Sequence, residues 1–300
     1  MNSLYVYLAV IIYILIGFYI AYKARQGMKQ GVIEYFLDNR STTGIVSALS
    51  YSATTYSAFM MIGLAGFTYS GGVGALGFEL IYLAGLSLVA FFGPRFWLVG
   101  KKYGYVSPYE MLGDRFENKW IAIVSAGAAC IFLIPYLSVQ LMGIGYLLEG
   151  LSGGEIPFLV GVLIAAVLAI SWAIIAGMRS VTWTDSLQSI IMMTVSILIL
   201  FYVVYTQLGG FLSFFRQLET EYSNFLSVPG PGFFNFQTFL GLTLPWFVCC
   251  ISNPQVSQRL FIPKSLKAMK TMIKGFLIFG FIYTLVSVLW GFSAKLLLPG

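Results

Sequence analysis

Residues 44–70 read GIVSALSYSATTYSAFMMIGLAGFTYS, and the fold depends on how this stretch is arranged. It is long enough to cross a bilayer, which takes about 20 residues, but its first half is rich in Ser and Thr. In hydrocarbon every backbone polar group must be satisfied by the protein, so an interrupted helix is tolerated only where it lines a cavity or is buried. We therefore expect a helix with a break near the membrane midplane. The alternative is a packing face of small residues, because Ser, Thr and Gly also let helices approach closely.

Long apolar stretches dominate the remainder of the chain. Of the 300 residues, 59% are hydrophobic and 9% are charged, whereas a soluble domain carries about 25% charged residues to cover its surface. Eight stretches are long enough to cross a bilayer, namely 3–23, 44–70, 74–99, 120–148, 157–177, 184–207, 233–256 and 271–298. We therefore expect an all-α polytopic membrane protein with a single transmembrane domain over residues 1–300 and about eight transmembrane helices.

The basic residues are distributed unevenly among the connections. Of the 17 Lys and Arg residues, 15 lie in the connections after the first, third, fifth and seventh stretches. Basic residues near the ends of spans are retained on the cytoplasmic side, so we expect these connections in the cytoplasm and the N-terminus outside. The net charge of +6 follows from these loops and does not indicate a nucleic-acid partner.

Residues suited to catalysis are scarce. The chain has no His, the commonest general base, and no pair of acidic residues is clustered within a predicted span. Cys130, Cys249 and Cys250 lie in apolar stretches, and we expect them to be buried packing residues. The sequence therefore argues against an enzyme, and a membrane enzyme is the weakest alternative.

Glu79 is the only acidic residue well inside an apolar stretch. A carboxylate at the centre of a membrane helix costs roughly 2.5 to 3.5 kcal/mol on insertion scales, so it should face a cavity or a partner. Glu79 is therefore a candidate for contact with a solute. The alternative is a position near the outer interface, a few residues after Gly71, Gly72 and Gly74, where water reaches it.

The seventh stretch ends in a polar sequence that contains Pro254. Proline removes a helical hydrogen bond, and Asn253 and Gln255 on either side offer donors and acceptors. We expect a kinked helix end that gates a cavity, or alternatively the plain exit of a helix from the membrane.

Two further connections are interpreted as structural. Residues 29–44 are polar and predict a short amphipathic cytoplasmic helix. In residues 176–193, Thr184 or Asp185 is placed to cap the helix that follows.

Three motifs in order resemble the sodium:solute symporter family, which includes proline, pantothenate and sugar carriers. EYFLDNRS at 34–41 followed by residues 47–69 is similar to the family's first cytoplasmic loop and unwound helix. GMRSVTWTDSLQ at 177–188 is similar to its signature segment, and NPQVSQR at 253–259 to the motif that closes its seventh span. The resemblance is closest to the pantothenate and proline branch. It implies a leucine-transporter-type inverted-repeat fold, incomplete here because the chain would end partway through the second repeat.

The resemblance also implies a sodium site. The backbone carbonyls of Ala53 and Tyr56 would hold Na⁺ as the coupling ion, with Thr55 and Ser57 nearby. The other wall of that site would come from a ninth span that this sequence does not contain. Oxygen ligands suit such a cation.

By the same resemblance a solute would be bound by Ser57, Met60, Gly63, Glu79, Asn253 and Gln255. Met60 stands where sugar carriers have Gln, which argues against a sugar, whereas Glu79 falls where sugar carriers have an acid. Thr55 stands where proline carriers have Asp, and Gln255 where proline and pantothenate carriers have His. The sequence therefore leaves the identity of the solute open.

Taken together, we expect sodium-coupled symport of a small organic solute across the plasma membrane by a multi-pass protein that works by alternating access. The alternatives are a transmembrane sensory or solute-binding module of a signalling protein, a non-transporting fragment of a symporter, and a channel. The partners implied are the solute and the lipid bilayer, and the oligomeric state stays open.

Overall fold

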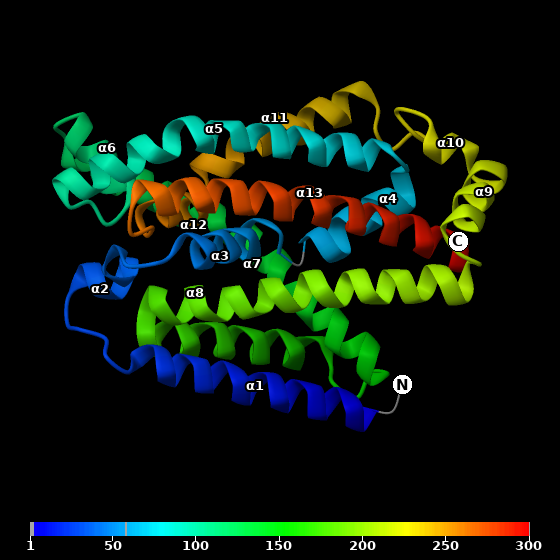
Figure 1. The fold of residues 1–300 in the computed structure, drawn as a ribbon, viewed down its shortest axis with the longest axis horizontal. Helices are drawn as coiled ribbons and strands as arrows, with labels where there is room; N and C mark the ends of the chain where they lie inside the picture. The colour runs from blue at the N-terminus through cyan, green and yellow to red at the C-terminus, as the bar shows by residue number, and fades with distance from the viewer. Residues whose placement is uncertain (1–2, 58, 300) are drawn as a thin grey trace.

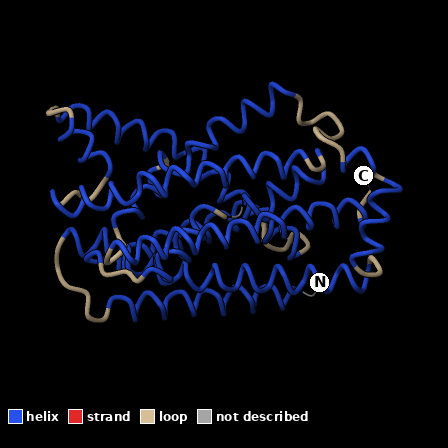
Figure 2. The backbone as a smooth tube through the Cα atoms, turned by 45° about the horizontal axis from the view of Figure 1, so that its top comes forward, coloured by secondary structure: helices blue, strands red, loops and turns tan. Residues whose placement is uncertain are grey.

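The computed structural model describes residues 3–57 and 59–299, which form a bundle of helices with their long axes side by side (Figure 1). Residue 58, inside the predicted span 44–70, lies outside the described residues. Within the described ranges the only β-type pairing is one bridge between Thr42 and Pro263, so the all-α class is confirmed (Figure 2). The elements, with 3-10 and π segments written η, are α1 Ser3–Arg25, α2 Val32–Leu37, η1 Asp38–Arg40, α3 Gly44–Thr55, η2 Phe59–Leu64, α4 Ala65–Gly71, α5 Gly74–Tyr103, α6 Pro108–Arg115, α7 Lys119–Ser152, α8 Phe158–Gln207, α9 Phe211–Glu221, α10 Ser223–Leu226, α11 Phe236–Ser252, α12 Pro254–Gln258, η3 Arg259–Phe261 and α13 Leu266–Leu297.

Several of these helices are long and apolar enough to cross a membrane. Among the described residues there are 6 by length and composition, in α1, α5, α7, α8, the run from α11 through η3, and α13. The count becomes 7 when α3 and the helix over residues 60–71 are taken as one broken span, bent by 54°. The predicted break within 44–70 is thereby confirmed.

α8, Phe158–Gln207, consists of two helices joined by a turn. Ala176 and Gly177 leave the helical range, and Gly177 has φ 52° and ψ −140°, which a residue with a side chain rarely adopts. Trp172 before the turn and Gln188 after it line the same cavity, whereas a straight helix would separate them by about 24 Å. α8 therefore folds back on itself as two arms (Figure 1). The turn lies at the C-terminal end of the predicted span 157–177, and the count of eight spans stays a prediction.

The expectation that Thr184 or Asp185 caps a helix is wrong. The second arm of α8 resumes directly after Gly177, so both residues lie inside it, and the Thr184 hydroxyl donates to the Ser180 carbonyl at 3.0 Å. Because a glycine makes the turn itself, the helix starts earlier than the first side chains suited to a cap.

The core lies where α3 packs on α13 and α5 packs on α11. Tyr51 stacks on Phe276 with ring centroids 4.3 Å apart, and its hydroxyl donates to the Cys250 carbonyl at 2.8 Å. Tyr56 is fully buried, and its hydroxyl lies so close to Gly280 that a Cβ there would overlap it. α13 thus supports the C-terminal end of α3.

Many exposed apolar side chains, which suit contact with lipid, lie on α1, α7 and α8. Cys130 of α7 is exposed as well, so the expectation that it is buried is wrong. Cys249 is partly buried and Cys250 buried; all three thiols are free. An apolar stretch in a membrane protein can face either lipid or the core, and here Cys130 faces outward.

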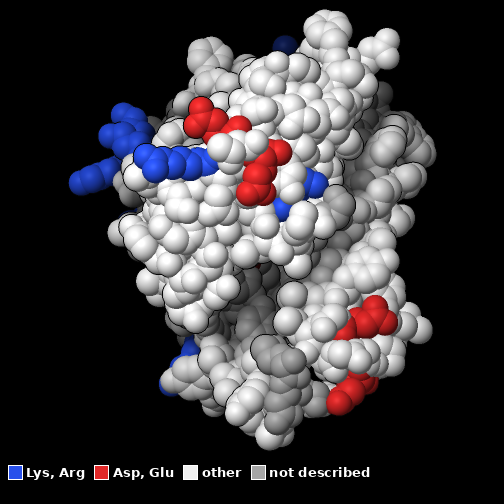
Figure 3. Space-filling model, turned by 90° about the vertical axis from the view of Figure 1, so that its right-hand side faces the viewer, with Lys and Arg blue, Asp and Glu red and all other residues white. Residues whose placement is uncertain are grey.

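The two ends of the bundle differ in charge and contacts. The end that carries the N-terminus is mostly uncharged, with scattered acidic and basic groups (Figure 3). It is the end at which the distribution of Lys and Arg predicts the outer side of the membrane.

Near the opposite end, the loop before α3 is held to the start of the second arm of α8. The predicted short helix within 29–44 is present there as α2. Asp38 follows it and accepts hydrogen bonds from the hydroxyls of Ser41 and Thr42 at 3.3 and 3.2 Å, with Arg179 at 3.8 Å. Burial is the largest influence on the Asp38 carboxyl and raises its pKa above the ordinary value, against the opposing effect of these partners.

The contact between Gly280 and Tyr56 gives a stability prediction. Gly280→Ala adds a methyl group where the Tyr56 hydroxyl already lies, and overpacking of this kind costs about 1–3 kcal/mol, so the melting temperature of the purified chain should fall. Gly127→Ala is the matched control, because nothing lies within 4 Å of a Cβ at that helical position. Equal melting temperatures for the two variants would contradict the packing described.

Candidate functional site

The first break in the bundle lies between α3 and η2. α3 ends at Thr55, and Tyr56 follows with φ −102° and ψ 59°, outside the helical range. The chain re-enters a helix through Met60, whose amide donates to the Ser57 carbonyl at 2.9 Å. The last carbonyls of a helix have no partner within it, so the end of α3 presents oxygen atoms to whatever lies in the gap.

The four residues predicted to hold sodium, Ala53, Thr55, Tyr56 and Ser57, all lie at this break. Within residues 3–57 and 59–299, no hydrogen bond reaches the Ala53 carbonyl. The Thr55 hydroxyl donates to the Tyr51 carbonyl at 2.9 Å and keeps its own lone pairs. These residues offer the carbonyl and hydroxyl oxygens that a hard cation prefers, and no cluster of three or more His, Cys, Asp or Glu side chains in the described ranges suggests another metal.

The second break separates α11 from α12. Asn253 is extended, with φ −62° and ψ 126°, and Pro254 begins α12. The side-chain oxygen of Asn253 accepts a hydrogen bond from the Gln255 amide at 3.3 Å, so Asn253 caps the short helix. The kink predicted from Pro254 is present.

Tyr136 of α7 connects the two breaks. Its hydroxyl donates to the Thr54 carbonyl at 3.5 Å and lies beside the side chains of Ser57 and Gln255. The Ser57 hydroxyl is buried there without forming a well-directed hydrogen bond. The fold thus brings two of the predicted solute residues, Ser57 and Gln255, to one place. Tyr136 was not predicted as a site residue from the sequence. Its position beside Pro135 in a mostly apolar span is the feature that could have pointed to it.

Glu79 forms a separate centre. It is fully buried in α5, and its Oε2 accepts a hydrogen bond from Trp246 Nε1 at 3.2 Å, while Oε1 has no partner in the described part of the chain. The alternative position in water at the outer interface is therefore wrong, because α11 covers this side of α5. No hydrogen bond in that same part joins Glu79 to Ser57 or Gln255. Met60 is buried and Gly63 half-buried on the adjoining helix.

A buried ion pair holds three elements around the first break. Arg259 lies 2.7 Å from the Asp185 carboxylate and donates from Nε to the Ser50 hydroxyl at 3.1 Å, and that hydroxyl donates to Asp185 at 2.7 Å. A second guanidinium nitrogen donates to the Gln255 carbonyl at 2.7 Å. We call Arg259, Asp185 and Ser50 the clamp, since it links η3, α8 and α3. From the sequence, Asp185 was expected at a helix start, and Arg259 was expected only as a cytoplasmic basic residue at the end of the motif 253–259.

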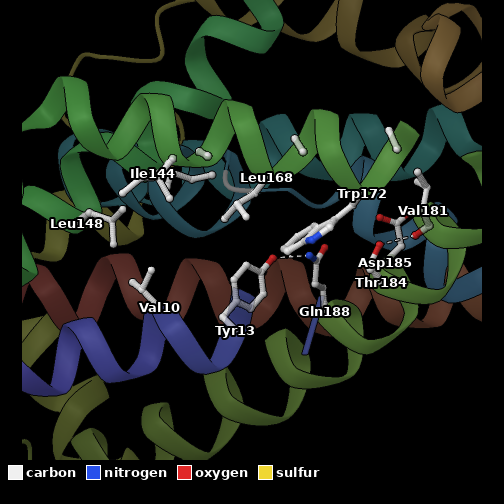
Figure 4. A pocket seen from close by; sticks show the side chains of 14 residues that line it. Val10, Tyr13, Ile144, Leu148, Leu168, Trp172, Val181, Thr184, Asp185 and Gln188 are labelled. Atoms are coloured by element: carbon white, nitrogen blue, oxygen red, sulfur yellow. Dashed lines mark hydrogen bonds between the residues drawn. The ribbon is translucent and has the colours of Figure 1, made fainter. Parts of the chain in front are cut away.

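Asp185 also borders a cavity of about 410 Å³ between α1, α7 and the two arms of α8 (Figure 4). Its wall is mostly apolar, and at its polar end Gln188 donates to the Tyr13 hydroxyl at 2.5 Å. None of the residues predicted to bind sodium or solute lines this cavity. The candidate site at the two breaks, where Tyr136 lies beside Ser57 and Gln255, is therefore separate from this hollow.

A family model described as Sodium:solute symporter family matches residues 35–298. The chain is 27% identical to the sodium/pantothenate symporter of Escherichia coli (strain K12) over 290 residues, which cover 93% of this chain and 59% of that protein. It is 26% identical to sodium/proline symporter 2 of Staphylococcus saprophyticus over 275 residues, which cover 87% of this chain and 50% of that protein.

Among solved structures, a Na⁺-coupled sialic acid symporter in a substrate-bound outward-open state matches with a TM-score of 0.80 and 18% identity. The match covers 98% of this chain and 61% of that one, and it shows the fold. The chain spans about half the length of the curated relatives it matches.

The clamp gives a prediction for stability. Arg259→Gln leaves the Asp185 carboxylate buried without its cation, and breaking a buried pair on one side costs about 3–5 kcal/mol. We expect a clear fall in the melting temperature of the purified chain. Adding Asp185→Asn to that variant should restore part of the loss, because no charge then remains unpaired. If the decrease in melting temperature of the double variant equals the sum of the decreases of the two single variants, the two residues act independently and the clamp is wrong.

Proposed function

Because this chain belongs to the sodium:solute symporter family, we propose that it takes part in sodium-coupled symport of a small organic solute across the plasma membrane. The observation that carries the proposal is the gap at which two broken helices meet beside Tyr136. Broken helices at the midplane are the means by which secondary transporters expose backbone carbonyls to a cation and amides to a substrate.

Sodium is proposed to bind at the C-terminal end of α3. The macrodipole places partial negative charge at that end, and the Ala53 and Tyr56 carbonyls with the Thr55 and Ser57 hydroxyls supply oxygen atoms. The free lone pairs of Thr55 support this assignment, as does the Ser57 hydroxyl, which is buried and forms no well-directed hydrogen bond in the described part of the chain. No acidic residue lies among these four, so a singly charged ion fits the set better than a divalent one.

The solute is proposed to lie in the same gap. Ser57 and Gln255 would face it, because both border Tyr136, and Tyr136 joins them as a residue absent from the sequence-based set. Asn253 would act by capping α12, Met60 and Gly63 would contribute from η2 after the break, and Glu79 would contribute from α5. Relatives are named for pantothenate and proline, and either is a reasonable first solute to test.

Coupling follows if sodium prefers one arrangement of the break. A ligand shifts a conformational equilibrium only by its differential affinity for the two states. An ion that holds the end of α3 in the arrangement completing the solute pocket would therefore raise the affinity for solute. A membrane potential adds about 2.3 kcal/mol per charge per 100 mV to the driving force.

Sodium binding is tested on the purified chain. Sodium should raise the melting temperature, by an amount equivalent to about 2.7 kcal/mol at 100 times the dissociation constant, whereas potassium at equal ionic strength should not. Ser57→Ala should need a higher sodium concentration for the same shift, and Thr55→Ala likewise. Ser125→Ala, which removes a hydroxyl bonded within α7, should behave as wild type. An equal rise in melting temperature with sodium and with potassium would contradict the proposed sodium site.

Transport is tested in proteoliposomes that contain the chain. An inward sodium gradient should drive uptake of labelled pantothenate or proline, and a potassium gradient should not. Tyr136→Phe keeps the ring and removes the hydroxyl that borders Ser57 and Gln255, so it should raise the solute concentration for half-maximal uptake more than the sodium concentration. Absence of sodium-dependent uptake of any solute, in a preparation that still binds sodium, would show that the chain alone is not a transporter.

A further inference from the structure

A second hollow, of about 800 Å³, lies where α1 ends and the chain turns into α2. Its wall is formed by the last residue of α1, the turn that follows, α2 and the first arm of α8. Arg25, Lys29 and Gln30 contribute its polar side, and Val32, Ile174 and Ile175 contribute its apolar side. The basic residues place it at the membrane surface on the predicted cytoplasmic side.

The polar side carries positive charge that forms no ion pair in the described ranges. Arg25 and Lys29 are both exposed, and the two ion pairs found in the described ranges involve other residues, Arg179 with Asp38 and Arg259 with Asp185. The acidic residue of α2, Glu34, does not line the hollow. An anion that enters here therefore meets two cations and no carboxylate.

The apolar side is unusually exposed for a surface near water. Val32 is 62% exposed and Ile174 is 65% exposed, and both border the same hollow as the basic side chains. A soluble anion gains nothing from such a surface. A molecule with an anionic head and aliphatic chains satisfies both sides at once.

We propose that this hollow binds an anionic phospholipid of the cytoplasmic leaflet. The phosphate lies between Arg25 and Lys29, and an acyl chain runs along Val32, Ile174 and Ile175. This assignment stands apart from symport, because it uses none of the residues placed in the sodium or solute sites.

The hollow borders parts of the fold that are held to the breaks. The Tyr35 hydroxyl donates to the Ala173 carbonyl at 3.2 Å, and the Tyr35 carbonyl packs on Gly177 with no room for a Cβ. Gln258 of α12 donates to the Phe36 carbonyl at 3.3 Å. A lipid in the hollow therefore bears on α2, which contacts both the turn in α8 and the end of α12.

The experiment measures the melting temperature of the purified chain while phosphatidylglycerol or phosphatidylcholine is titrated into detergent micelles. Phosphatidylglycerol should stabilise at lower concentration than phosphatidylcholine. The double variant Arg25→Gln, Lys29→Gln should lose about 30-fold in apparent affinity for phosphatidylglycerol, since each basic residue near an anionic surface contributes roughly a factor of five. The variant should keep its melting temperature in phosphatidylcholine, because both side chains are exposed.

The matched control is Lys267→Gln, Lys270→Gln, which removes the same charge from exposed positions at the start of α13. This control variant should keep the preference for phosphatidylglycerol. If both double variants lose the same apparent affinity for phosphatidylglycerol, the effect comes from overall charge and the proposed binding site is wrong. Inorganic phosphate and glycerol phosphate, added at millimolar concentration, should compete weakly. If inorganic phosphate or glycerol phosphate binds as tightly as the lipid, the hollow is a general anion site and the phospholipid assignment is wrong. Equal stabilisation by phosphatidylglycerol and phosphatidylcholine would also contradict the assignment.

Discussion

A backbone amide or carbonyl left unpaired in hydrocarbon costs several kcal/mol, and this constraint governs the molecule. A helix may stop inside the membrane only where something else serves its free groups. At the end of α3 the Tyr136 hydroxyl reaches the Thr54 carbonyl, and at the start of α12 the Asn253 side chain accepts from an amide two residues on. Within residues 3–57 and 59–299 no hydrogen bond reaches the Ala53 carbonyl, so a cation bound there would do for this carbonyl what a neighbouring helix does elsewhere. The carbonyl oxygen that the broken helix leaves unpaired is thus one of the atoms that are proposed to bind sodium.

The clamp determines where those breaks lie relative to one another. Arg259 contacts Asp185, Ser50 and the Gln255 carbonyl together, so each of the three guanidinium nitrogens donates one hydrogen bond and the charge is compensated by Asp185. A planar, always charged group suits this position better than Lys, which offers a point charge on a flexible stem. Buried pairs of this kind add little net stability compared with apolar packing. Their contribution here is to fix the register of α3, α8 and η3.

Much of the architecture follows from the sequence because membrane helices obey few rules. Apolar length predicts the spans, and the Ser-rich stretch and Pro254 predict the two breaks, since both signals are local. The turn at Gly177 coincides with the end of the predicted span 157–177, but the helix that follows begins before Thr184, because the glycine itself makes the turn. Cys130 was misplaced because apolar neighbours do not distinguish core from lipid. Tyr136 and the clamp could not be found in this way. Their roles depend on contacts between residues 74 to 209 positions apart, and no local pattern reports which faces of distant helices meet.

That same separation along the chain has a consequence for biogenesis. α3 is synthesised 209 residues before the Arg259 that completes the clamp, and α2 is synthesised 138 residues before the part of α8 on which Tyr35 rests. During that interval a hydroxyl-rich helix resides in or beside the bilayer with its polar face unmatched, and its entry into lipid is correspondingly unfavourable. We therefore expect α3 to stay at the insertion machinery, or near the membrane surface, until the last third of the sequence has been synthesised. A substitution of Arg259 or its neighbours would then leave α3 unpacked, and cellular quality control would recognise that unpacked helix.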